Sequence, residues 1–192
     1  MKAIAIIQDE HRAITSVIEG LRHMLVEVAA GRIPVDHALL GAMFHYIETF
    51  PEKLHHPKED LVFAKIKERD STMARIVDDL HRQHARIHAA GAELVRQLDD
   101  IVNGSIASRA AIEAAARDYV DGLRKHMRVE ESDVLPHAAT LLNGRDWSAI
   151  HAAIGRVQDP LFGKHPEHRY ASLRQQISRD AHDADRPAAG IP

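Results

Sequence analysis

The chain has 192 residues, a length that fits one domain with a substantial buried core, and its 25 basic and 28 acidic residues leave a net charge of −3. This balance provides no basic field for nucleic acid, so we expect no nucleic-acid partner. Because the chain has no cysteine, disulfides, zinc ribbons and thiol catalysis are excluded.

The opening residues 1–7 are mostly apolar but form too short a run for the hydrophobic region of a signal peptide. They lead directly into the first helical pattern, without a segment that resembles a cleavage site. We therefore expect a cytoplasmic protein with no membrane partner.

The first predicted helix follows apolar positions from Ile7 to Val28, whose spacing alternates between four and three residues. His11 occupies one of these inward positions. Residues 31–34 break the pattern, and Asp36 is the predicted N-cap of the second helix.

The second predicted helix carries His55 and Glu59 one turn apart on its inner face. Pro57 falls between them, where a proline removes a backbone donor and disfavours a continuous helix. Two alternatives follow. Either the helix kinks at Pro57, or it restarts with Pro57 near its first turn.

The third predicted helix follows a break at residues 69–71, with Asp70 or Ser71 as its cap. Its apolar stripe includes His84 and Gly91. Since glycine costs about 1 kcal/mol relative to alanine inside a helix, Gly91 predicts a close backbone approach at this point.

The fourth predicted helix follows a break at residues 103–105 and places His126 and Glu130 on its inner face. All the connections between these helices are short, so neighbouring helices should run antiparallel. The sequence therefore predicts an all-α protein built as an up-down-up-down four-helix bundle with extra C-terminal helices.

Beyond Pro136 the bundle pattern stops, and short helices are predicted over residues 137–142, 146–156 and 167–178. Their apolar side chains, such as Trp147 and Leu173, need a surface on which to bury. We expect a bundle over residues 1–140, a helical extension packed on it over 141–182, and a disordered tail over 183–192.

The two halves of the chain repeat one pattern, in which a lone His precedes a His-x-x-x-Glu pair by nearly the same number of residues. All these side chains fall on inward positions, where an unpartnered polar group costs about 1 to 3 kcal/mol. Two cations would partner all of them, and this ligand set suits iron, manganese or zinc. The predicted metal ligands are His11, His55, Glu59, His84, His126 and Glu130.

Residues 8–12, 50–60, 81–84 and 125–131 resemble the hemerythrin-like, HHE cation-binding domain family in its bacterial branch. The resemblance covers about residues 1–140, and its most specific part is His-His-Pro-Lys-Glu. It implies an oxo- or hydroxo-bridged di-iron centre inside the bundle. The four predicted histidines match the family's terminal ligands, and the two glutamates match its bridging carboxylates.

Three further residues are weaker candidates. His88 could act as a fifth imidazole ligand, although it lies one position past the inner stripe, and His56 could be an occasional extra ligand beside the predicted pair. Tyr119 could hydrogen-bond a metal-bound oxygen species, or it could be a core aromatic whose hydroxyl has a protein partner.

Counting two His, two bridging Glu and one shared oxygen gives each octahedral ion one open position. This count favours a redox enzyme that binds or reacts with small oxidants (oxygen, peroxide or nitric oxide) in stress defence or the repair of iron centres. The alternative is a di-iron sensor, carrier or store that acts through a protein partner at the C-terminal helices. A purely structural bundle is a third possibility.

Overall fold

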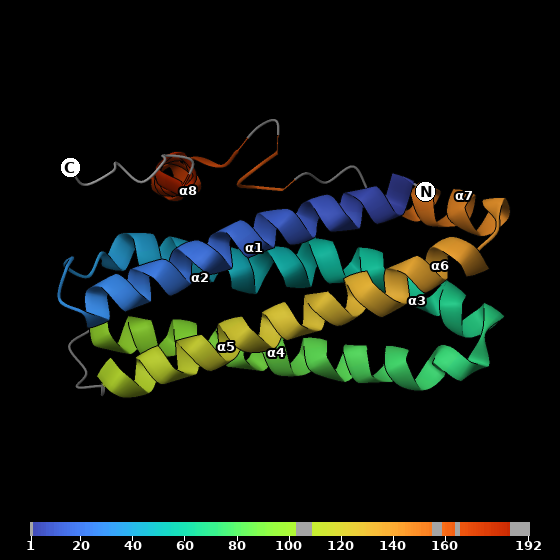
Figure 1. Ribbon diagram of the computed structural model, residues 1–192, viewed down its shortest axis with the longest axis horizontal. Coiled ribbons are helices and arrows are strands. Elements are labelled where there is room, and N and C mark those ends of the chain that lie inside the picture. The colour runs from blue at the N-terminus through green and yellow to red at the C-terminus, as the bar shows by residue number, and fades with distance from the viewer. Residues whose placement is uncertain (1, 103–108, 155–158, 164–165, 185–192) are drawn as a thin grey trace, which may run out of the picture.

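The computed structural model describes residues 2–102, 109–154, 159–163 and 166–184 (Figure 1). These residues form helices and no strand, which confirms the all-α prediction. Four rods run alternately up and down along the long axis, as predicted. They are α1 (Lys2–Ala29), then α2 (His37–Phe50) continued by η1 (Pro51–His55) and α3 (His56–Arg69), then α4 (Ala74–Val102), and last α5 (Arg109–Val129) continued by η3 (Glu130–Val134) and α6 (Leu135–Leu141).

Local signals set the ends of these helices. Asp36 caps α2, because its carboxylate accepts a hydrogen bond of 2.9 Å from the backbone N–H of Leu39. Asp70 likewise accepts from the N–H of Thr72 at 2.9 Å and opens the short 3₁₀ turn η2 (Ser71–Met73) that leads into α4. Both predicted caps are therefore confirmed, while the predicted break at residues 103–105 lies outside the described residues.

Two π-helical segments interrupt the second and fourth rods. The first, η1, ends at His55, and α3 begins directly after it with Pro57 in its first turn, as in the second alternative, although the backbone stays helical from η1 into α3. The second, η3, begins at Glu130. A π turn inserts one residue into a helix and rotates the side chains that follow it, and such turns are frequent at functional sites.

The buried apolar side chains form two clusters, one toward each end of the bundle. One cluster includes Phe44, Phe50 and Leu123, and the other includes Phe63 and Val134. The predicted metal ligands belong to neither cluster, because they form a polar layer in the interior of the bundle. Apolar packing on both sides of this layer keeps water away from it.

The C-terminal helices pack on the bundle. Helix α6 directly continues the fourth rod, with Pro136 in its first turn, where the sequence suggested that the bundle ends. After α6, α7 (Gly144–Ala153) contacts α1 and α3, and η4 (His168–Tyr170) leads into α8 (Ala171–Ala184), which contacts α1 and α2.

The outer limits of this extension differ from the prediction. The last two residues of the predicted helix 146–156 and most of the predicted tail, residues 185–192, lie outside the described residues. Position 183 and Ala184 end α8. None of the described helices combines the length with the apolar character that a membrane span requires.

Candidate metal centre

Every rod of the bundle contributes to the polar layer. His11 comes from α1, His55 and Glu59 from the second rod, His84 from α4, and His126 and Glu130 from the fourth rod. All six side chains are buried, and the two glutamates have no exposed surface. The sequence places all six residues on the inner stripes of the helices, and the structure buries all six inside the bundle.

Glu59 lies between two groups of imidazoles. Its Oε1 is 3.0 Å from His11 Nε2 and 3.0 Å from His55 Nε2. Its other oxygen, Oε2, is 3.4 Å from His84 Nε2. One carboxylate therefore faces imidazoles on both sides.

Glu130 has the same arrangement. Its Oε1 is 3.1 Å from His126 Nε2 and 3.5 Å from His84 Nε2, and its Oε2 is 3.4 Å from His11 Nε2. Each carboxylate thus directs one oxygen toward the side of His11 and the other toward the side of His84. Two carboxylates placed in this way can each bridge a pair of ions.

The layer also contains polar atoms that the protein leaves unsatisfied. Among the residues that the structure describes, the buried side-chain nitrogen and oxygen atoms without a hydrogen-bond partner all lie here: His56 Nδ1, Glu59 Oε2, His84 Nε2, His126 Nε2 and both carboxylate oxygens of Glu130. Such atoms are expensive to bury. Since imidazole nitrogens and carboxylate oxygens are atom types that bind metals, the residues present fit a bound cation.

The two carboxylates change the protonation of the imidazoles around them. Burial lowers the pKa of His11, but the hydrogen bonds and charges of Glu130 and Glu59 outweigh it and raise the pKa to about 10. For the same reasons the pKa of His84 rises to about 9. Burial raises the pKa of Glu59, but the neighbouring imidazoles hold it well below its ordinary value. Two ionised carboxylates thus attract positive charge to this layer.

Three of the imidazoles are oriented by a hydrogen bond on their outer side. His11 Nδ1 donates to Glu131 Oε1 at 3.0 Å, and His55 Nδ1 donates to Glu10 Oε2 at 3.0 Å. His126 Nδ1 donates to Gln83 Oε1 at 3.1 Å. Because carboxylate and amide oxygens only accept, each Nδ1 donates its proton outward, and in the neutral form of the ring this leaves the lone pair on Nε2, the nitrogen that faces the two glutamates.

Sequence reasoning missed Glu10 and Gln83. Each stands next to a predicted ligand in the chain, but each bonds an imidazole on a different rod, so no spacing rule reveals the pair. Glu10 is buried and also accepts a hydrogen bond from the buried ammonium of Lys58. The Lys58 ion pair makes the burial of this carboxylate possible.

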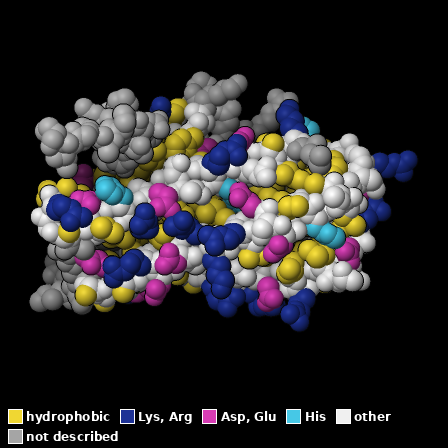
Figure 2. Space-filling view, viewed as in Figure 1, with side chains coloured by type: hydrophobic (Ala, Val, Ile, Leu, Met, Phe, Trp, Pro, Cys, Tyr) yellow, Lys and Arg dark blue, Asp and Glu magenta, His cyan; other side chains and the backbone are white. Residues whose placement is uncertain are grey.

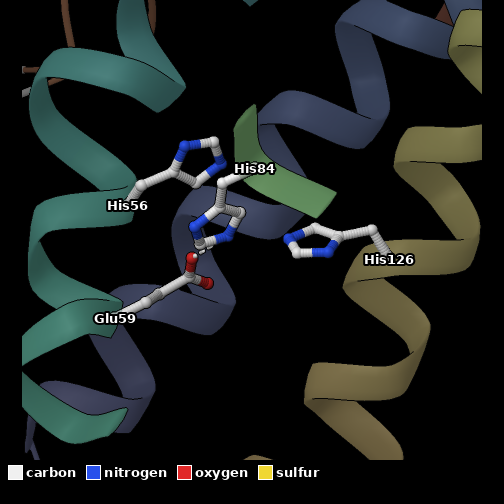
Figure 3. Close-up of side chains that lie close together, drawn as sticks. All are labelled: His56, Glu59, His84 and His126. Atoms are coloured by element: carbon white, nitrogen blue, oxygen red, sulfur yellow. Dashed lines mark ion pairs between the residues drawn. The ribbon is translucent and has the colours of Figure 1, made fainter. Parts of the chain in front are cut away.

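His56 is buried beside the layer rather than outside it. Its ring stacks on His84, with centroids 3.7 Å apart and planes 13° apart. Its Nδ1 is 3.2 Å from Glu52 Oε1, although the geometry is not that of a hydrogen bond. His56, Glu59, His84 and His126 form one group whose ligand atoms could hold an ion (Figure 3), and His11, His55 and Glu59 form a second.

The other two weaker candidates lie away from the layer. The His88 side chain is 47% exposed, and its Nδ1 is 3.9 Å from Glu52 Oε1. Tyr119 is buried and donates to the backbone carbonyl of Ile47 at 3.3 Å. Its hydroxyl therefore has a protein partner, which is the second of the two alternatives considered for this residue.

One of three comparisons with known proteins found a match, and it is to a cation-binding family. A family model described as the hemerythrin HHE cation-binding domain matches residues 2–138. Comparisons with curated proteins and with solved structures found no significant match. Because the family match spans most of the chain and includes every residue of the polar layer, the chain belongs to the hemerythrin HHE family of cation-binding domains.

Proposed function

We propose that the polar layer holds two iron ions. His11 and His55 would hold one ion, His84 and His126 would hold the other, and Glu59 and Glu130 would supply carboxylate oxygens to both. The observation that carries this proposal is the placement of one oxygen of each carboxylate toward each group of imidazoles, at 3.0 to 3.5 Å. His56, stacked on His84, is a candidate extra ligand of the second ion.

The proposed reaction requires a redox-active ion, which excludes zinc and leaves manganese as the alternative to iron. Imidazole and carboxylate ligands suit iron, manganese and zinc. Zinc has no redox chemistry, whereas bound iron supplies one-electron oxidation and reduction. We propose that the protein uses this chemistry to bind or react with oxygen, hydrogen peroxide or nitric oxide, in defence against oxidative or nitrosative stress or in the repair of iron centres.

Burial limits the reactants to small molecules. The ligands lie inside the bundle, between two apolar clusters. A surface pocket of about 330 Å³ opens between α4 and α5 and includes Gln83, which bonds His126. We propose this pocket as the entry route. Its lining residues are Gln83, Arg86, Ile87, Gly122, Lys125 and Val129.

Iron analysis and rapid mixing test the proposal. The purified protein, loaded anaerobically with ferrous iron, should bind two ions per chain and show the absorption of a bridged diferric centre after oxidation. Stopped-flow mixing with peroxide or nitric oxide should give a faster reaction than free ferrous iron gives. The Glu59→Gln and Glu130→Gln variants should lose iron, and a wild-type reaction no faster than free iron would contradict the oxidant chemistry.

A sensor is the second candidate function, because a row of aromatic contacts links the layer to the C-terminal extension. Phe50 stacks on His55 with centroids 6.4 Å apart, Tyr46 stacks on Phe50 at 5.2 Å, and Tyr170 meets Tyr46 edge-on at 5.8 Å. A redox change at the layer that moved His55 would be transmitted along this row. Hydrogen exchange in α8 that differs between reduced and oxidised protein would favour sensing over turnover.

A further inference from the structure

The groups behind the imidazoles differ between the two sides of the layer. We call His11 and His55 the first half and His84 and His126 the second half. In the first half both outer hydrogen bonds end on carboxylates, Glu131 and Glu10, at 3.0 Å each. In the second half, the outer hydrogen bond found among the described residues runs from His126 Nδ1 to the neutral side-chain amide of Gln83, at 3.1 Å.

The first half has strong acceptors. A hydrogen bond to an ionised group is roughly twice as strong as one between neutral groups. It draws the proton away from Nδ1, which makes Nε2 of the same ring a better electron donor to a metal. The Lys58 ammonium binds one oxygen of Glu10 and leaves the other to His55, so the acceptor is held in place inside the protein.

The second half has weaker hydrogen-bond acceptors behind its imidazoles. Gln83 carries no charge, and the other ring nitrogen of His84 has no hydrogen-bond partner among the described residues. One face of the His84 ring instead packs on His56, with centroids 3.7 Å apart. Neither contact increases the donor strength of an imidazole as a carboxylate does, so the comparison applies where His56 packs on His84 without itself binding the ion.

We propose that the two metal positions are unequal: the first half binds its ion more tightly and favours its higher oxidation state, and Glu10 and Glu131 are the positioning residues that create the difference. This proposal rests on the two-ion centre proposed above. Its consequence is that the ion of the second half is bound last, is exchanged first and is the more easily reduced of the two.

A charge exchange between the halves tests this inequality. Glu131→Gln removes a carboxylate acceptor from the first half, and Gln83→Glu adds one to the second. The double variant carries both changes and keeps the net charge of the wild type. Glu131 is 45% exposed, so replacing it leaves no buried charge without a partner. Glu10→Gln is the companion variant for His55.

Anaerobic titration with ferrous iron gives the first measurement. Wild-type protein should bind two ions in two separate steps. Removal of an outer partner typically lowers metal affinity by about 10 to 100-fold, so Glu131→Gln should weaken the first step by that factor and bring the two steps together. Gln83→Glu should raise the affinity of the second step. The double variant should narrow the difference in affinity between the two steps or reverse their order.

Spectroelectrochemistry gives a second measurement, which does not depend on turnover. Electrons supplied by the electrode should reduce one iron of the wild type well before the other. Glu131→Gln should raise the reduction potential of the iron that is harder to reduce. Gln83→Glu should lower the reduction potential of the iron that is easier to reduce. A loss of fold would not produce these two opposite shifts.

Asp133→Asn is the matched control, because Asp133 is exposed on the same segment as Glu131 and, among the described residues, forms no hydrogen bond or ion pair with a predicted ligand. It makes the same change in net charge and should leave both steps and both potentials unchanged. Two wild-type steps of equal affinity, or equal shifts in the variant and the control, would overturn the inequality alone. Fewer than two ions in the wild type would overturn the two-ion centre itself.

Discussion

The ring of Tyr119 on α5 lies in the space that a side chain on Gly91 of α4 would need. A Cβ added to Gly91 would be 3.2 Å from Tyr119 Cε2, closer than ordinary van der Waals contact. The sequence predicts a close approach at Gly91, and the structure shows that the approaching group is a side chain. Glycine at this point lets the Tyr119 hydroxyl reach the carbonyl of Ile47.

We expect Gly91→Leu to destabilise the protein by about 1 to 3 kcal/mol, because the added side chain must displace a buried aromatic ring. In a Tyr119→Leu background the same change should be less harmful, and chemical denaturation of all four proteins measures this coupling. Gly41→Leu is the control, since a Cβ at Gly41 meets nothing within 4 Å. Equal losses at both glycines would contradict this account.

The bundle and the composition of the centre could be predicted because they depend on local repetition. The inner stripes of the four rods are marked by apolar residues at helical spacing, and His11 and His84 interrupt two of them with a polar residue. Short connections then determine the antiparallel order. Where a polar residue replaces an apolar one on such a stripe, a binding role is the simplest physical reason.

The other features depend on contacts that one rod alone does not encode. His56 lies one position off the inner pair in the sequence, yet its side chain is buried and its ring stacks on His84 from another rod. Glu10 is buried only because Lys58, on another rod, neutralises it. Neither fact follows from the spacing of residues within one helix.

Removal of the metal should lower the unfolding free energy of the protein, because the six predicted ligands bind ions only when the protein is folded. An ion bound only to the folded protein stabilises it by about 2.7 kcal/mol per site at a hundredfold excess over its dissociation constant. His84→Ala should lose much of this gain, measured as the difference in unfolding free energy with and without iron. His88→Ala, one turn further along α4, should keep it, and an equal loss there would restore His88 as a candidate ligand.

Tyr46 ties the C-terminal extension to the bundle. Its buried hydroxyl donates to Asp159 Oδ2 at 2.7 Å, and burial together with the charge of Asp159 raises the pKa of Tyr46. Tyr46→Phe should destabilise the protein by about 1.5 to 3 kcal/mol, the usual range for a bond to a charged group. Tyr170→Phe is the control, because the Tyr170 hydroxyl has no hydrogen bond within the described residues, and a similar loss there would show that the effect does not come from the bond to Asp159.

Asp146 should make stability depend on pH in acid. The hydrogen bond from Arg69, at 2.8 Å, and the one from the N–H of Asn143 hold the pKa of Asp146 below its ordinary value of 3.8. A lowered folded-state pKa stabilises the fold above pH 3.8, and this contribution is lost as the pH falls through the folded-state pKa. Asp146→Asn should therefore be less stable than wild type near neutrality, with a difference that shrinks in acid.

Urea unfolding of both proteins between pH 7 and pH 3 measures that difference directly. Asp133→Asn, an exposed change of the same charge, should show none. A constant deficit for Asp146→Asn down to the lowest pH would assign the effect to the N-cap of α7 rather than to the ion pair with Arg69.

The pocket between α4 and α5 can be filled without disturbing the bundle. Gly122 lines this pocket, and a Cβ there would meet nothing within 4 Å. On the face that Figure 2 shows, Lys and Arg side chains gather near the middle, over α5 and α4.

Gly122→Phe should keep or slightly raise stability, since glycine costs about 1 kcal/mol in a helix, and should slow the reaction of the iron-loaded protein with peroxide. Gly41→Phe makes the same replacement on α2 and should leave the rate unchanged. If both variants react as fast as wild type, small molecules reach His126 by another route, because a phenyl ring beside Gln83 would obstruct this one.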